Sequence, residues 1–233
     1  MKNICEILGR AIARSFGLSV TIEGKMAQAE EAPICVIAPH SSRLDKFLVF
    51  GFLGNTSFVA SEDKLISQIF GPIISFSQYI FVYHKNSCSR SNAECEIVRR
   101  SNLYKHPNLD ERWPRIGLFP EGAHSNRRVL MRFKTGAFKP GKPVQPILIR
   151  YPNRIDTVTN DLDNRMRAIW VTLCQPITRV ELEYLPVYHP NLDEQKDAEL
   201  FASNVRTMIA KKLALPLCEM TYKEAKEQRK KFR

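Results

Sequence analysis

A histidine and an aspartate five positions apart are the first residues in the sequence whose types suggest catalysis. His40 and Asp45 follow an apolar run, 34–38, that ends at Pro39. If His40 lies in the turn and Asp45 opens a helix, the carboxylate can fix the imidazole tautomer and stabilise its charged form. The other ring nitrogen is then free to act as a general base. This spacing alone does not identify an enzyme.

A second candidate segment is Phe119-Pro120-Glu121-Gly122, which follows another apolar run. Gly122 would let a backbone approach a ligand closely, and nearby cations can bind phosphate oxygens. The cations that follow in the sequence are Arg127, Arg128, Arg132 and Lys134. On its own, this segment would be an ordinary turn at the end of a strand.

Both segments come directly after predicted strands, and the chain alternates between strand and helix patterns. Strands are predicted at 34–38, 57–60, 79–83, 116–119, 144–149, 169–173 and 180–185, and helices at 45–53, 64–74, 91–104 and 200–213. This alternation predicts an α/β fold with a mixed, largely parallel sheet flanked by helices. Ligands of such sheets bind beyond the carboxyl ends of the strands, where both segments lie.

An amphipathic helix is predicted at the N-terminus. Its apolar residues recur at helical spacing and its charged residues share the other side: Ile4, Ile7, Leu8, Ala11 and Ile12 against Lys2, Glu6, Arg10 and Arg14. Such a helix could pack on the protein's own core or lie in a bilayer interface, and the sequence leaves both open. We divide the chain into this helix with its lead-in (1–24), a central domain (25–215) and a basic tail (216–233).

Positive charge is concentrated in the middle of the chain. The net charge is +11, and residues 84–154 hold 15 basic against 5 acidic side chains. This surplus favours an anionic partner, which could be a phosphate-bearing ligand, an anionic lipid or a nucleic acid, although a solvated basic face is also possible. The six cysteines have no metal-type spacing, so we expect reduced thiols facing the cytosol and no metal site.

Taken together, the two segments resemble the glycerolipid acyltransferase superfamily, whose first motif is N-H-x-S-x-x-D and whose third is F-P-E-G-T. Ser42 fits the serine of the first motif, and Val144-Gln145-Pro146-Ile147 resembles the fourth motif. Further segments between residues 34 and 215 narrow the resemblance to the lysophosphatidylcholine acyltransferase branch: 133–138, 143–146, 150–153, 173–175, 185–188 and 202–206. Two positions depart from the family pattern, since His84 replaces the arginine of the second motif and Ala123 the threonine of the third.

The resemblance implies an acyl-CoA-dependent O-acyltransferase that moves a fatty acyl group onto a lysophospholipid hydroxyl, with lysophosphatidylcholine favoured. His40 would take the hydroxyl proton during attack on the thioester, and Asp45 would orient His40. A thiolate leaves with a pKa of about 8.5 and needs little general-acid help. The residues expected to bind substrate are Ser42, Arg90, Pro120, Glu121, Gly122, Arg127 and Lys134. Acyl-CoA is the co-substrate, and no cofactor is expected.

Several alternatives stay open at this point. The acceptor could be lysophosphatidic acid or glycerol phosphate, or the enzyme could be a transacylase that uses no coenzyme A. Ser41 or Ser42 could be a nucleophile, although the sequence holds no G-x-S-x-G elbow. A basic nucleic-acid-binding protein is a further alternative, but it would leave the His40 and Asp45 pattern unexplained. We therefore expect no nucleic-acid partner.

A membrane surface is the expected place of action, although no stretch reaches the roughly 20 apolar residues of a spanning helix. The last four residues, 230–233, read K-K-x-x and resemble a dilysine retrieval signal. We expect the cytosolic face of the endoplasmic reticulum, or lipid droplets. The same basic tail could instead be a solvated helix end or an electrostatic tether to anionic lipid.

Overall fold

A seven-stranded sheet organises the computed structural model, which describes residues 2–42, 44–54, 56–61, 78–83, 87–103, 113–158, 170–221, 224–225 and 227–228. The strand order is β1-β7-β6-β2-β5-β3-β4. The strands are β1 (Leu18–Glu23), β2 (Ile34–Ala38), β3 (Thr56–Ser61), β4 (Ile80–Val82), β5 (Arg115–Leu118), β6 (Val144–Arg150) and β7 (Thr178–Tyr184). All neighbours are parallel except β6 and β7, which confirms the predicted mixed, largely parallel sheet.

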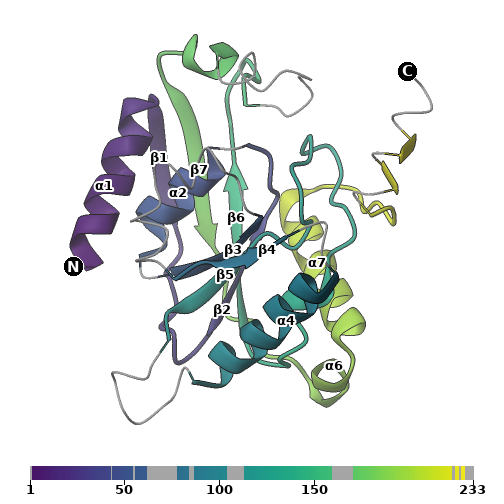
Figure 1. The fold of residues 1–233 in the computed structure, drawn as a ribbon. Coiled ribbons are helices and arrows are strands. Elements are labelled where there is room, and N and C mark those ends of the chain that lie inside the picture. Colours follow the sequence, from purple (N-terminus) through teal and green to yellow (C-terminus); the bar gives the residue numbers. More distant parts are fainter. Residues whose placement is uncertain are drawn as a thin grey trace.

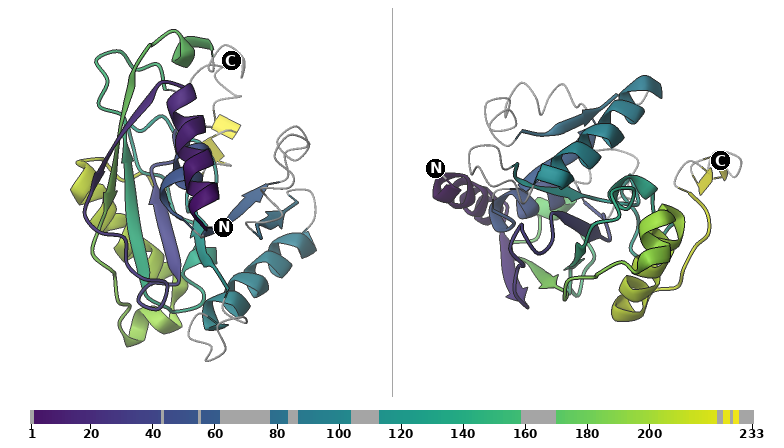
Figure 2. Two further views of the ribbon diagram at one scale, coloured as in Figure 1. Left: turned by 90° about the vertical axis from the view of Figure 1, so that its left-hand side faces the viewer. Right: turned by 90° about the horizontal axis from the view of Figure 1, so that it is seen from below.

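Helices cover both faces of this sheet, as Figures 1 and 2 show. They are α1 (Lys2–Ser15), α2 (Asp45–Phe52), α4 (Ser87–Asn102), α6 (Leu192–Lys196) and α7 (Ala198–Leu213), with a 3-10 turn, η3, at Thr135–Ala137. None of the helices within the described ranges is long and apolar enough to cross a membrane.

The central strand β2 is apolar along its whole length because both of its faces are covered. All five of its residues are buried. Side chains alternate between faces along a strand, so Val36 joins the cluster that contains Phe138 and Phe201, whereas Ile37 joins the cluster that contains Leu48. Helices α4 and α7 therefore cover one face of the sheet, and α1 and α2 cover the other.

One predicted strand is wrong. Residues 170–173, within the apolar run 169–173, are helical. The run cannot pair with the strand that follows it, because β7 already pairs with β1 on one side and with β6 on the other. The run lies on the surface instead, where Trp170 and Leu173, one helical turn apart, are both exposed.

Other elements differ from prediction in extent. The strand β1 was not predicted, and it makes residues 18–23 of the lead-in an edge strand of the sheet. The helix α6 was not predicted either. The predicted helix 91–104 begins earlier, at Ser87. The predicted helix 64–74 lies outside the described residues, as do residues 229–233 of the tail.

The N-terminal helix is present, and it packs on the protein through its small residues. Gly9 and Ala13 are buried against α2, and the Arg10 guanidinium donates to the Gly51 carbonyl at 3.3 Å. Large apolar side chains of the predicted apolar face point outward instead, since Ile7 is 66% exposed and Leu8 38% exposed.

The contact between α1 and α2 yields a stability prediction for Gly51→Ala. A Cβ at Gly51 would lie 2.6 Å from the Gly9 carbonyl carbon. Alanine favours a helix over glycine by about 1 kcal/mol, but crowding in a packed interior costs about 1–3 kcal/mol. We expect a net loss of about 1 kcal/mol, measured as a lower Tm and faster amide exchange in α1.

Gly136→Ala is the matched control for this experiment. The nearest atom to a Cβ there is Ile97 Cδ1 at 4.0 Å, so the substitution meets open space. A Gly51→Ala protein at least as stable as Gly136→Ala would show that α1 does not need this close approach.

Candidate active site

The candidate site forms where β2 ends and α2 begins. His40 lies two residues after β2, and Asp45 is the first residue of α2. A negative side chain in the first turn of a helix is favoured by the positive end of the helix dipole. Both side chains are buried, and Asp45 has no exposed surface.

Three donors converge on one oxygen of Asp45. Its Oδ2 accepts hydrogen bonds from His40 Nδ1 at 2.8 Å, from the Ser41 N–H at 2.8 Å and from the Ser42 N–H at 2.9 Å. Burial opposes ionisation, but the hydrogen bond and charge of His40 and the N–H of Ser42 outweigh it, so the pKa of Asp45 is below its usual value. Because the carboxylate is ionised and can only accept, His40 Nδ1 carries the proton and Nε2 is the basic nitrogen.

The His40 ring is held between two other rings. Its centroid is 3.8 Å from that of Phe119, nearly parallel, and 4.1 Å from that of His124. The His40 carbonyl also accepts a hydrogen bond from the Ser125 N–H at 2.6 Å. The turn after β5 therefore fixes both the ring and the backbone of His40.

The buried side chain of Glu121 also links the turn after β5 to the backbone of His40. Its carboxyl is 1% exposed, and its oxygens accept from the His40 N–H at 3.0 Å and the Met131 N–H at 3.4 Å. Burial raises the pKa of Glu121 to about 7, and the charge of Asp45 adds to this rise, although the two N–H groups oppose it. In this position Glu121 holds the His40 backbone, a contact that the sequence did not indicate.

A cationic group lies beside Gly122. This glycine has φ +71°, and a Cβ on it would be 2.4 Å from Lys134 Nζ. The Lys134 N–H donates to the Pro120 carbonyl at 2.8 Å. Burial lowers the pKa of Lys134, and the positive charge of Arg90 on α4 lowers it further. The fold thus gathers Gly122, Lys134 and Arg90, three of the residues predicted to bind substrate.

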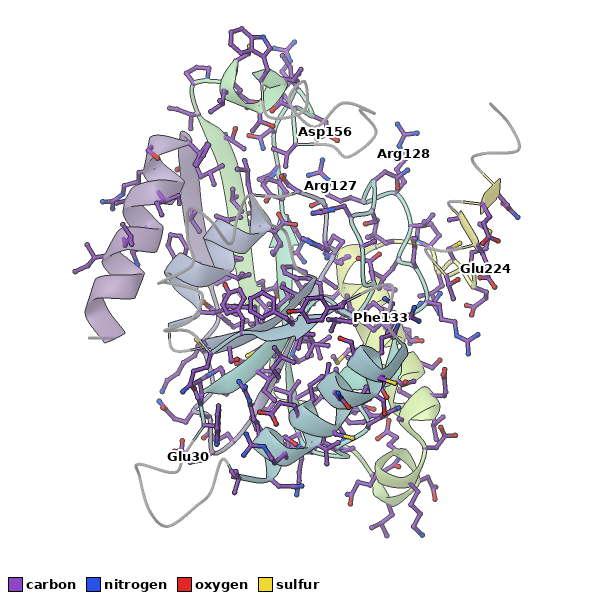
Figure 3. The ribbon with its side chains drawn as sticks, viewed as in Figure 1. Glu30, Arg127, Arg128, Phe133, Asp156 and Glu224 are labelled. Carbon is purple, nitrogen blue, oxygen red and sulfur yellow. The ribbon has the colours of Figure 1, made fainter. Side chains whose placement is uncertain are left out.

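Ser42 and Arg127, also predicted to bind substrate, have other contacts near the histidine and aspartate pair. Ser42 builds the start of α2, where its Oγ accepts from the Leu44 N–H at 3.1 Å. Arg127 pairs with Asp156, as Figure 3 illustrates, and its guanidinium carbon is 5.1 Å from the centroid of the Tyr151 ring.

Sequence reasoning missed Tyr151, whose hydroxyl donates to Asp45 Oδ1. Its segment, 150–153, was noted only for its resemblance to the acyltransferase branch. No spacing pattern pointed to a contact between Tyr151 and Asp45. His124 was also missed, although it lies in the turn directly after Gly122.

The described residues contain no group of three His, Cys, Asp or Glu side chains that could hold a metal ion. The side chains gathered at the site are an imidazole, a carboxylate that holds it, and cations that can bind an anion. Deprotonation of a hydroxyl next to a phosphate-bearing molecule fits this set.

Comparison with known proteins identifies the family to which the chain belongs. Residues 19–150, more than half of the chain, match the Acyltransferase family, so the chain belongs to the acyltransferase family. The crystal structure of the 1-acyl-sn-glycerophosphate (LPA) acyltransferase PlsC from Thermotoga maritima has the same fold. It aligns with a TM-score of 0.60 and 20% identity over 91% of this chain and 79% of that chain.

Particular relatives confirm the resemblance to the lysophosphatidylcholine acyltransferase branch. The Drosophila melanogaster lysophosphatidylcholine acyltransferase is 42% identical over 207 residues, 88% of this chain and 38% of the relative. Lysophosphatidylcholine acyltransferase 2 from Homo sapiens is 38% identical over 223 residues, 95% of this chain and 40% of the relative. The chain spans about two fifths of the length of these curated relatives.

The buried carboxyl of Glu121 predicts a pH dependence of stability. Because the folded-state pKa of about 7 lies above the ordinary glutamate pKa of 4.5, folding favours the protonated form. The stability it contributes is complete below about pH 4.5 and is lost as the pH rises through 7. Between pH 5 and 8, the wild type should lose up to about 3 kcal/mol of unfolding free energy that Glu121→Gln does not lose.

Glu194→Gln provides the control in urea unfolding experiments. Glu194 is also 1% exposed, but hydrogen bonds from Tyr188, Asn204 and Asn191 overcome burial and lower its pKa. Its contribution is therefore lost only as the pH falls through the lowered pKa, outside this window. A constant difference between wild type and Glu121→Gln from pH 5 to 8 would contradict the assignment.

Proposed function

We propose that this chain transfers a fatty acyl group from acyl-CoA to the hydroxyl of a lysophospholipid, with lysophosphatidylcholine as the favoured acceptor. The observation that carries the proposal is the buried pair of His40 and Asp45, in which Nδ1 is held at 2.8 Å and Nε2 is the basic nitrogen. The printed names of relatives at about 40% identity support the choice of acceptor.

The proposed reaction needs one base. His40 Nε2 takes the proton of the acceptor hydroxyl as the oxygen attacks the thioester carbonyl of acyl-CoA. The imidazolium that forms is stabilised by Asp45, and the carbon–sulfur bond then breaks to release coenzyme A as a thiolate. A positioned base of this kind contributes about 10²–10⁴-fold in rate.

The cations beside Gly122 support phosphate binding. Lys134 Nζ lies over Gly122, and the charge of Arg90 on α4 acts on the same ammonium. Two like charges held close to each other repel, and a bound phosphate would relieve that repulsion. We assign this group to the phosphate of the acceptor or to a phosphate of coenzyme A.

Contact with a membrane surface is part of the proposal, because exposed apolar residues gather near the site. We define the apolar lobe as residues 153–158 and 170–179. Its large apolar side chains are exposed: Ile155, Trp170, Leu173 and Ile177. Hydrogen bonds hold its two segments together, including Thr172 Oγ1 to the Thr157 carbonyl at 2.9 Å and the Arg179 N–H to Asn153 Oδ1 at 2.8 Å.

The apolar lobe adjoins both α1 and the active site. The Gly17 carbonyl, just after α1, accepts from the Thr178 N–H at 2.8 Å, and Asp156 of the lobe pairs with Arg127. Figure 1 shows the helical turn of the lobe at the top of the molecule, by the start of β7. Exposed Arg154 and Arg179 suit the phosphates of lipid head groups. We propose that the lobe and the outward side of α1 face the bilayer.

His40→Ala should reduce acyl transfer by at least about 10²-fold without unfolding the protein, because the base is lost. Asp45→Asn should be nearly as damaging, since it permits the wrong tautomer. The assay is a panel of lysophospholipid head groups with several acyl-CoA donors. His189→Ala, which removes an exposed histidine, is the matched control. Full activity in His40→Ala would refute the mechanism, and a preference for lysophosphatidic acid would refute the acceptor.

Trp170 should report membrane contact directly. The chain holds two tryptophans, and Trp113 lies under the Arg100 guanidinium, whose carbon is 4.1 Å from the ring centroid. In a Trp113→Phe background, Trp170 fluorescence should be quenched by vesicles of brominated phosphatidylcholine, because its indole should lie in the interface. Unquenched fluorescence under conditions where the protein sediments with vesicles would exclude the lobe from the contact.

A substitution pair completes this membrane experiment. Leu173→Asp should weaken vesicle binding by about tenfold, because it removes an apolar side chain worth about 1.5–3 kcal/mol when buried. Leu192→Asp replaces an equally large exposed residue on α6, at the other end of the molecule in Figure 1, and should leave vesicle binding unchanged. Equal effects of the two substitutions would show a general charge effect.

A further inference from the structure

We propose that Tyr151 is a positioning residue of the active site, whose hydroxyl holds the second oxygen of Asp45 and thereby fixes the histidine and aspartate pair. The inference rests on the proposed role of His40 as the base. Tyr151 donates to Asp45 Oδ1, whereas the three donors described above all bind Oδ2. The tyrosine therefore anchors the end of the carboxylate that His40 does not reach.

The topology explains why this residue comes from so distant a part of the sequence. Tyr151 directly follows β6, which pairs in parallel with β2 so that Leu148 lies opposite Ala38. Neighbouring parallel strands bring the residues after their carboxyl ends together at one edge of the sheet. His40 follows β2 at that edge, and Asp45 is the first residue of the next helix. Tyr151 therefore lies beside the histidine and aspartate pair.

The hydroxyl is a donor with a fixed proton. Burial and the negative charge of Asp45 raise the pKa of Tyr151 well above its ordinary value, so the phenol stays protonated. The Arg127 guanidinium lies over its ring, 5.1 Å from the centroid, and is itself paired with Asp156. One face of the Tyr151 ring is therefore covered by the Arg127 guanidinium.

A fourth donor matters because Asp45 is fully buried. Each oxygen of a buried carboxylate needs hydrogen bonds, and an oxygen that loses its donor is strongly destabilised. The hydroxyl of Tyr151 stabilises the Asp45 charge most when His40 is neutral, since an imidazolium already neutralises part of that charge. Removal of the Tyr151 hydroxyl would therefore leave more of the Asp45 charge to be balanced by the imidazole, which favours the protonated form of His40 in that variant.

Other charged or titratable groups face the pair and must be considered in any pH experiment. Glu121 binds the His40 backbone N–H, and the His124 ring lies 4.1 Å from the His40 ring. Arg127 and its partner Asp156 lie beyond Tyr151. A substitution that removes only the phenol oxygen leaves all four of these groups in place, so its effect can be assigned to the hydroxyl.

The test compares Tyr151→Phe with Tyr184→Phe. The Tyr184 hydroxyl donates to the Phe52 carbonyl at 2.9 Å, so this control also loses one hydrogen bond between the sheet and α2 but none to Asp45. In Tyr151→Phe, we expect kcat to fall about tenfold with KM within about twofold, and the acidic limb of the pH–rate profile to move up by about half to one pH unit. Tyr184→Phe should match the wild type in both respects.

A second measurement does not depend on catalysis. NMR titration of the histidine ring carbons follows each of the five histidines, and the His40 signal is assigned by its loss in His40→Ala. The His40 midpoint should rise in Tyr151→Phe and stay in place in Tyr184→Phe. If no acyl transfer is found with any acceptor but the His40 midpoint moves in this way, the proposed function fails and the positioning role stands. Equal midpoints in the two variants overturn the positioning role.

Replacement of the tyrosines by fluorotyrosine keeps the experiment decisive if Tyr151→Phe does not fold. Fluorine makes each phenol a stronger hydrogen-bond donor without removing its hydroxyl. The stronger donor to Asp45 should lower the His40 midpoint, opposite in sign to the phenylalanine variant. An unchanged midpoint in the folded fluorotyrosine protein would overturn the role assigned to Tyr151.

Discussion

The need to keep one buried carboxylate ionised shapes the centre of this protein. Asp45 has no contact with solvent, and its charge is supported only by hydrogen-bond donors placed around it. Those donors come from the turn after β2, from the imidazole of His40 and from the residue that follows β6. The parallel pairing of β2 and β6 brings these donors together around Asp45. The arrangement of these central strands and the ionised state of Asp45 therefore depend on each other.

The pKa values of two buried carboxyl groups near His40 are shifted in opposite directions. The pKa of Asp45 lies below its ordinary value, whereas that of Glu121 is raised to about 7. The difference follows from their partners, because Asp45 binds a side chain that can carry positive charge, whereas the partners of Glu121 are neutral groups. When neighbouring titratable groups have pKa values pushed apart in this way, they take different roles. Here the Asp45 carboxylate holds the His40 imidazole, and the Glu121 carboxyl holds the His40 backbone.

The sequence was informative where structure is determined by neighbouring residues. The apolar run 34–38, the turn after it and the helix that begins at Asp45 were all predicted, because each depends on local pattern. The contact of Tyr151 with Asp45 was not predictable, since it depends on the register of β6 against β2. The strand predicted at 169–173 failed for a similar reason, because strand propensity does not reveal that both sides of β7 are occupied. The orientation of α1 was not predictable for the same reason. Its small residues pack on α2, which turns its large apolar side chains outward.

The position of β1 at the edge of the sheet has a consequence for the order of events on the ribosome. Leu18 pairs with Thr178, so β1 is synthesised before its partner β7, with every other strand of the sheet in between. Parallel pairing over such a distance must await closure of a long loop, which makes it a slow step in folding. The core around β2, β5 and β6 can assemble before β7 arrives, but β1 cannot. The strand β1 therefore emerges before the other strands of the sheet and is among the last of them to be secured.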